Sequence, residues 1–388
     1  PPFTWSFIKG ERSSAYTCVT FLAELIDNGI DAKCRKIDIT LKPGTNGDLI
    51  KLVIKDNGDG MTKEELSGSY RIGSTKAYKK NSIGKFGRGG TMGCISVARK
   101  KKTFTIKDNV VLGRGFDLDL VIKLDQWASF QILPPQEIQS SLENTGGTLI
   151  ELTEFDDLDE KNVSTLKKTL VEAISQIYNM FLSRGNKITL NGEEIKPWDP
   201  LLFNHPKTQR WLDGKNTEGR DYFFWPDEEG VSHRVEIKAV YLEDVKLEEK
   251  VRMPPRGQRS RKPLARAQGG HFYRCDRIMH TGALTDANGL TGFYDRHSNK
   301  RNFRFSVTYV PELDKQFGTF KSKDGFKMDS LLSKNIADII IPFAQRAERM
   351  NRGSETKNNQ DNVEKTLSNL EGILNTEKYM APKVKKGR

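Results

Sequence analysis

The sequence predicts a mixed α/β protein, and two kinds of apolar pattern lead to this fold class. Short apolar or alternating stretches, typical of strands, occur at residues 37–41, 49–54 and 303–310. Longer segments at 162–184 and 328–350 carry apolar residues at helical spacing. Strands and helices therefore alternate along the chain, as expected of α/β domains.

The length of 388 residues allows two hydrophobic cores. Prolines and polar residues replace the periodic pattern between about 197 and 218, so we expect a domain boundary there. The expected domains are residues 1–195 and residues 196–350. A polar linker, a short helix and a basic tail are expected in residues 351–388. Leucines of that helix predict either a short coiled-coil seam or a stripe that docks on the chain itself.

The first predicted helix contains residues 24–32 (ELIDNGIDA) and has a polar face. Glu24 and Asn28 are four residues apart and Asp31 follows three later, so all three share this face. A carboxylate can orient and deprotonate a water molecule, and an amide oxygen beside it can bind Mg²⁺ together with substrate phosphates. The pattern favours hydrolysis of a nucleoside triphosphate, although a solvated polar face is the simpler interpretation of this helix alone.

A second motif, KDNGDGM, occupies residues 55–61 directly after an apolar strand-like run. Asp56 therefore lies at a strand end, where a buried carboxylate can accept a hydrogen bond from an exocyclic amine such as that of adenine. Gly58 and Gly60 allow backbone to pass close to a flat ligand. An ordinary tight turn is the alternative; a calcium loop is disfavoured because its later glutamate is missing.

Two glycine-rich motifs follow. Residues 84–93 (GKFGRGGTMG) have a GxxGxG spacing and can bind phosphate through backbone N–H groups at a following helix N-terminus. They match neither a Walker A loop nor a dinucleotide fingerprint. Residues 145–148 (TGGT) lead into an alternating strand, and alone they indicate only a hairpin turn.

The order and spacing of these four motifs resemble the GHKL ATPase superfamily, which includes gyrase, MutL, histidine kinases and heat-shock chaperone ATPases. The resemblance covers roughly residues 10–155 and implies an N-terminal Bergerat-fold α/β sandwich that binds ATP and Mg²⁺. It assigns Glu24 as the general base, Asn28 as the Mg²⁺ ligand and Asp56 as the residue that reads adenine. Histidine kinases usually lack a counterpart of Glu24, so a hydrolytic member is favoured.

The same resemblance implies further nucleotide contacts. Asp31 would be a structural or water-bridging partner, Gly60 would back the adenine ring, and Thr148 would support a water network at Asp56. Residues from about 62 to 90 would form the ATP lid. The remaining expected contacts are Gly58, Met61, Gly84, Lys85, Phe86, Gly87, Arg88, Gly89, Gly90 and Thr91.

The segment 317–326 (FGTFKSKDGF) resembles a loop of the transducer domain, a ribosomal S5-like α/β domain in which a lysine reaches the γ-phosphate. Lys323 is the first candidate for that catalytic role and Lys321 the second, whereas a solvated loop is the alternative. Residues 271–279 (HFYRCDRIM) are similar to a strand and turn of MORC-type ATPases. The chain is therefore expected to be MORC-like within the superfamily.

The formal net charge of +12 favours a polyanionic partner. Residues 251–270 contain three prolines and no acidic residue, so we expect a basic loop that contacts the phosphate backbone of nucleic acid, with DNA favoured, or else a solvated loop. The candidate contact residues are Arg252, Arg256, Arg259, Arg261, Lys262 and Arg266.

These expectations combine into an ATP-dependent homodimeric clamp, in which residues 1–10 would form a strap to the partner. A heat-shock-type protein-remodelling chaperone and a nucleotide-gated binding module with negligible turnover are the alternatives. The four cysteines lack metal-site spacing and indicate reduced thiols of an intracellular protein, either cytoplasmic or nuclear. We expect no membrane span and no signal peptide.

Overall fold

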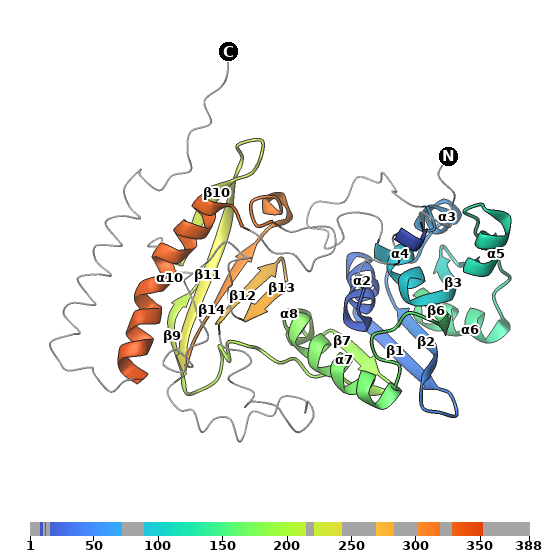
Figure 1. The fold of residues 1–388 in the computed structure, drawn as a ribbon, viewed down its shortest axis with the longest axis horizontal. Helices are drawn as coiled ribbons and strands as arrows, with labels where there is room; N and C mark the ends of the chain where they lie inside the picture. The colour runs from blue at the N-terminus through green and yellow to red at the C-terminus, as the bar shows by residue number, and fades with distance from the viewer. Residues whose placement is uncertain are drawn as a thin grey trace, which may run out of the picture. The chain divides into compact units, whose positions relative to one another are not determined.

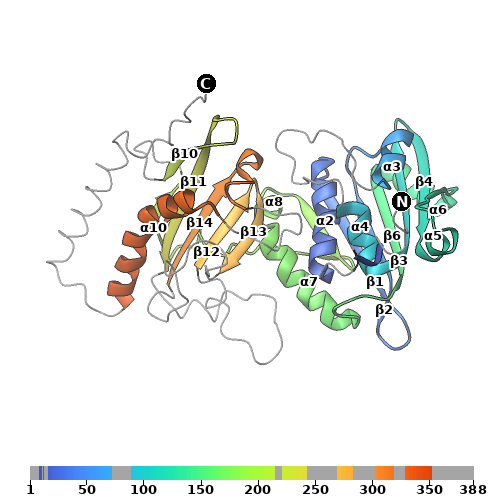
Figure 2. The same cartoon turned by 45° about the horizontal axis from the view of Figure 1, so that its top comes forward.

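The computed structural model places two compact units. One consists of Pro1–Ser175 and Phe181–Pro197, and the other of Gln176–Met180 and Trp198–Arg388. Figure 1 and Figure 2 show the elements of each unit in two views. The residues that the structure describes are 8–10, 12, 16–71, 89–214, 221–242, 269–282, 302–318 and 328–351.

The described part of the first unit is built on an eight-stranded sheet with strand order β5-β4-β3-β6-β2-β1-β7-β8. Neighbouring strands are antiparallel except for the parallel pair β1 and β7. The strands are β1 (Lys36–Pro43), β2 (Leu49–Asp56), β3 (Ala98–Lys107), β4 (Val110–Asp117), β5 (Phe130–Gln131), β6 (Gly147–Phe155), β7 (Lys187–Leu190) and β8 (Glu193–Glu194).

The helices of this unit are α2 (Cys18–Asp31), α3 (Lys63–Ser69), α4 (Gly89–Val97), α5 (Leu118–Leu124), α6 (Gln136–Thr145), α7 (Val163–Ile177) and α8 (Asn179–Ser183). α2 and α4 pack side by side over one face of the sheet (Figure 2). α6 packs on the other face, where Leu142 contacts Phe104 and Leu149. The sheet therefore lies between two helical layers.

The face beneath α2 and α4 has a regular register. Leu41, Leu52 and Leu152 are cross-strand partners in one row, and Ile39, Ile54 and Ile150 form the next. Successive rows of one face are two residues apart along each strand. This alternation buries one apolar set, as predicted for residues 37–41 and 49–54, and it defines the row in which each polar residue of the face lies.

The sequence predicts two strands over residues 104–124 that are joined near Gly113 and Gly115, and this position of the turn is wrong. The turn between β3 and β4 lies at Asp108 and Asn109, which both have positive φ values of 51° and 61°. Asn and Asp tolerate this conformation better than other side chains. The two glycines instead lie inside β4, where an added Cβ at Gly113 would be 2.5 Å from the carbonyl oxygen of Ile132. The end of the predicted second strand is helical, as α5.

Two further predictions need correction. The helix expected over residues 162–184 is split into α7 and α8, and at the break the Asn179 side chain donates to the carbonyl oxygen of Gln176. The stretch 197–218, expected to be irregular, contains strand β9 (Thr208–Asp213). This strand forms because it pairs with β11 (Ser232–Leu242), and the local sequence pattern of residues 208–213 does not indicate that contact.

The described part of the second unit contains a six-stranded sheet with the path β10-β11-β14-β12-β13, and β9 pairs with β11. Pairing is antiparallel except between β12 and β14. The elements are β10 (Tyr222–Pro226), β11 (Ser232–Leu242), β12 (Gly269–Arg274), β13 (Arg277–Gly282), β14 (Phe303–Tyr309), a 3-10 turn (Pro311–Leu313) and α10 (Ser330–Asn351). This is the second α/β domain that the sequence predicts.

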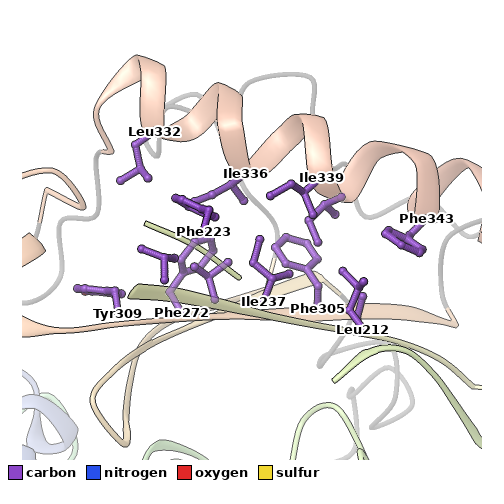
Figure 3. Packing of buried hydrophobic residues seen from close by; sticks show 14 of the residues in the cluster. Leu212, Phe223, Ile237, Phe272, Phe305, Tyr309, Leu332, Ile336, Ile339 and Phe343 are labelled. Atoms are coloured by element: carbon purple, nitrogen blue, oxygen red, sulfur yellow. The ribbon is translucent and has the colours of Figure 1, made fainter. Parts of the chain in front are cut away.

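Helix α10 packs along one face of this second sheet (Figure 3). Leu332 and Ile336 are fully buried, and they belong to the same cluster as Phe305 and Phe272 of the sheet. Burial of a large apolar side chain contributes about 2 kcal/mol, so the packing of α10 on this sheet stabilises the described part of the unit. None of the helices in the described ranges is both long enough and apolar enough to cross a bilayer.

Candidate functional site

Three polar side chains form one row at an end of the first sheet. Asp56 is the last residue of β2 and pairs with Thr148 of β6, and Thr148 pairs with Thr105 of β3. The hydroxyl oxygens of Thr105 and Thr148 are 3.1 Å apart. The sheet face that carries the leucine core therefore ends in a carboxylate and two hydroxyl groups.

Burial controls the electrostatics of Asp56. Desolvation raises the pKa of this carboxyl to about 6, although backbone N–H groups of Gly58 and Thr148 act in the opposite direction. The Gly58 N–H donates to Asp56 Oδ1 at 2.8 Å. A carboxylate in this setting gains from an additional hydrogen-bond donor, because a donor favours the charged form.

The loop after Asp56 packs closely against neighbouring backbone. An added Cβ at Gly58 would be 2.7 Å from the carbonyl oxygen of Ala32, and one at Gly60 would overlap the carbonyl oxygen of Ile106. The Met61 N–H donates to Thr105 Oγ1 at 3.0 Å. Only glycine allows the loop backbone to come this close to these two carbonyl groups. The close packing holds the loop beside the row of Asp56 and Thr105.

Helix α2 lies against this end of the sheet. An added Cβ at Gly29 would be 3.3 Å from the Asp56 Cβ. Thr17 caps the helix by accepting a hydrogen bond from the Thr20 N–H at 3.2 Å. The motif 24–32 is thus helical as predicted up to Asp31, and α2 brings its polar face next to the aspartate at the strand end.

The three predicted residues of α2 form its least buried stripe. Glu24 and Asp31 are half-buried and Asn28 is exposed, whereas Leu25, Ile26 and Asp27 on the other side of the helix are buried. An exposed amide one turn after a half-buried carboxylate is the arrangement that the spacing predicts.

The start of α4 contacts this stripe. Gly89 is the first residue of α4, and an added Cβ at the next residue, Gly90, would be 3.0 Å from Asn28 Nδ2. The Thr91 side chain is buried, and its hydroxyl donates to the carbonyl oxygen of Ser69 at 2.7 Å. A contact between Thr91 and a nucleotide, as predicted, would therefore involve its backbone.

Several predicted residues lie outside the described part of the chain. In the glycine-rich loop these are Gly84, Lys85, Phe86, Gly87 and Arg88. The transducer candidates Lys321 and Lys323 also lie outside it, as do the basic candidates Arg252, Arg256, Arg259, Arg261, Lys262 and Arg266. Their roles stay predictions.

No sequence motif identifies Thr105 and Lys101 of β3, which the structure places near the candidate site. Thr105 is fully buried, and its hydroxyl donates to the Gly147 carbonyl oxygen at 3.1 Å. Lys101 is also buried. Both belong to a basic strand that gave no motif, and only the pairing register with β6 places them on the inner face. In the described part of the chain, no group of three or more histidine, cysteine, aspartate or glutamate side chains is arranged to hold a metal ion.

Comparison with known proteins agrees with this geometry. Residues 16–148 match the family of histidine kinase-, DNA gyrase B- and HSP90-like ATPases. That stretch includes α2, the Asp56 loop, α4 and the first residues of β6, so the elements of the candidate site lie within the part of the chain that is similar to these ATPases. The chain is also similar to ATPase morc-1 of Caenorhabditis elegans, with 30% identity over 107 residues. The aligned part is 27% of this chain and 12% of that relative.

Proposed function

We propose that this chain hydrolyses ATP in a Mg²⁺-dependent reaction, and that ATP controls dimerisation of its N-terminal unit. The observation that carries the proposal is the convergence of α2, the end of β2 and the start of α4. Around that point lie the half-buried Glu24 and Asp56 and the exposed Asn28.

The residues at the strand end fit an adenine base. Asp56 would accept a hydrogen bond from the exocyclic amine, which favours the ionised carboxyl that burial disfavours. Thr148 and Thr105 supply hydroxyl groups in the same row for bridging water. Adenine binding would thus satisfy a group whose desolvation costs free energy in the ligand-free domain.

The residues on α2 fit the phosphate end. Asn28 offers an amide oxygen to Mg²⁺, which prefers oxygen ligands and, when bound, offsets charge on the phosphates. Glu24 would accept the proton of a water whose oxygen attacks the γ-phosphorus while the bond to the β,γ-bridging oxygen breaks. ADP and inorganic phosphate leave, and the carboxyl passes its proton to solvent.

The proposal includes two further properties of the chain, dimerisation and action on DNA. Dimerisation rests on the match of residues 16–148 to histidine kinase-, DNA gyrase B- and HSP90-like ATPases and on the similarity to ATPase morc-1. Action on DNA rests on the net charge of +12 and the basic segment 251–270. Sequence-independent phosphate contacts of this kind weaken steeply as salt concentration rises.

A phosphate-release assay tests the proposal in the full chain. The wild type should release phosphate from ATP only with Mg²⁺, and Glu24→Gln should bind ATP, dimerise more stably and release almost none. Lys42→Gln, which changes an exposed charge on β1, is the control and should match the wild type.

The same assay separates the alternatives. Stimulation by DNA that is lost when the arginines between 252 and 266 are neutralised supports a clamp on nucleic acid. Stimulation only by an unfolded protein client would indicate a remodelling chaperone. Tight ATP binding without turnover in the wild type would indicate a nucleotide-gated binding module.

A further inference from the structure

Lys101 occupies a position that the sheet pattern reserves for an apolar side chain. It pairs with Leu152, which in turn pairs with Leu52, so all three lie in one row of the inner face. Lys101 is only 3% exposed, and burial lowers its pKa. Retaining a lysine in a leucine row costs free energy unless its amine is well bonded.

The Lys101 amine is bonded to the first turn of α4. Its Nζ donates to Thr91 Oγ1 at 2.9 Å and to the Gly90 carbonyl oxygen at 3.3 Å. It also lies 4.7 Å from the centre of the Tyr70 ring. The lysine therefore binds two consecutive residues of α4 and the residue that follows α3.

The bonds continue to the end of α3. Thr91 donates to the carbonyl oxygen of Ser69 at 2.7 Å, and the Tyr70 hydroxyl lies 2.8 Å from Thr103 Oγ1 of β3. The end of α3 and the start of α4 are thus fixed to the same strand by a buried network. Such a network holds its members rigidly when every polar group in it is bonded.

The network reaches the candidate site through Gly90. The Gly90 Cα faces Asn28, since an added Cβ would be 3.0 Å from Asn28 Nδ2. Asn28 is exposed, so its orientation depends on such neighbours. Asp56, Thr148 and Thr105 lie two rows away from Lys101 along the sheet.

We propose that Lys101 is a positioning residue for the phosphate and Mg²⁺ end of the nucleotide site. By holding Gly90 and Thr91, it fixes the surface against which the Asn28 amide is oriented. This inference rests on the proposed ATPase function. It predicts that loss of the lysine weakens Mg²⁺-dependent steps and leaves recognition of the adenine end intact.

The test compares Lys101→Met with Lys102→Met in the full chain. Lys102 is the next residue of β3, its side chain is 49% exposed, and it lies 3.7 Å from Glu151 on the opposite face. For Lys101→Met, the Mg²⁺ concentration that gives half-maximal turnover should rise about tenfold, a typical effect of removing an outer-sphere partner. Adenosine affinity should stay within about twofold of the wild type, because binding of the base does not involve Gly90. Lys102→Met should match the wild type in both measurements.

Hydrogen exchange supplies a readout that needs no turnover. Amides of residues 89–97 should exchange about tenfold faster in ligand-free Lys101→Met than in Lys102→Met, because the first turn of α4 loses its buried bonds. If Lys101→Met does not fold, Thr91→Val removes the shared hydroxyl, keeps the lysine and should give the same pattern.

Equal Mg²⁺ dependence and equal exchange in the two lysine variants would overturn the inference. A parallel loss of adenosine affinity would also overturn it, since that result indicates general damage to the domain. Failure of the proposed function would look different: the wild type itself would show no Mg²⁺-dependent turnover or ATP binding, whereas failure of this inference leaves the wild type active.

Discussion

The raised pKa of Asp56 makes adenine binding depend on pH in a predictable direction. In the ligand-free domain the pKa is about 6, because burial disfavours the charged carboxyl. The ionised form is the stronger acceptor for the exocyclic amine, because a hydrogen bond to a charged oxygen is stronger than one to a neutral carboxyl. Affinity should therefore fall as the pH drops through about 6, and a binding constant measured at about pH 5 should be roughly tenfold weaker than at about pH 7.

The same pKa predicts the pH dependence of stability. In the folded domain the pKa exceeds the unfolded value of about 4, so the folded state binds more protons between these two values. Asp56 therefore lowers the free energy of unfolding as pH rises from about 4 to about 6, by about 3 kcal/mol in total. Above about pH 6 the effect is constant. The ligand-free domain thus carries a cost that adenine binding offsets.

Adenosine is the suitable ligand for this measurement, because it has no phosphate that titrates in the same range. NMR titration at a series of pH values should give an affinity curve with a midpoint near 6. Asp56→Asn should bind weakly at every pH, and Asp59→Asn, which changes a neighbouring carboxyl that is 51% exposed, should follow the wild type. An affinity that stays constant between about pH 5 and pH 7 would refute the reasoning.

Three substitutions test the packing. Gly90→Ala should leave the melting temperature unchanged or raise it, because alanine favours a helix, yet Mg²⁺-dependent turnover should fall as the new Cβ displaces Asn28. Asp314→Asn should lower the free energy of unfolding of the second unit by about 3 kcal/mol. Arg274 donates to both carboxylate oxygens of Asp314, and the substitution leaves its buried positive charge without the opposite charge. Ile336→Ala should cost about 3 kcal/mol in the same unit by leaving a cavity under α10. Urea denaturation checks both stability values, and unchanged midpoints would contradict them.

Local signals were sufficient for the elements that carry the motifs. The spacing of Glu24 and Asn28 predicted α2, and alternation predicted β1 and β2 with Asp56 at a strand end. The dipeptide Asn191-Gly192 is typical of a two-residue hairpin turn, and both residues have positive φ values between β7 and β8. In each case residues close in sequence determine the structure.

Features that depend on pairing between distant strands could not be predicted in this way. Gly113 and Gly115 are residues typical of a turn, but Ile132 packs so closely against both that only glycine fits within the strand. Lysine side chains usually face solvent, so the type of residue does not predict that Lys101 is buried. Its position on the inner face follows only from the pairing register with β6. The places where local patterns failed include the buried network beside the candidate site.

The most direct test of the central claim is Mg²⁺-dependent phosphate release by the purified wild-type chain beside Glu24→Gln. We expect that both proteins bind ATP, that the wild type releases phosphate only with Mg²⁺, and that Glu24→Gln releases almost none. Equal phosphate release by the two proteins, or no ATP binding by either, would contradict it.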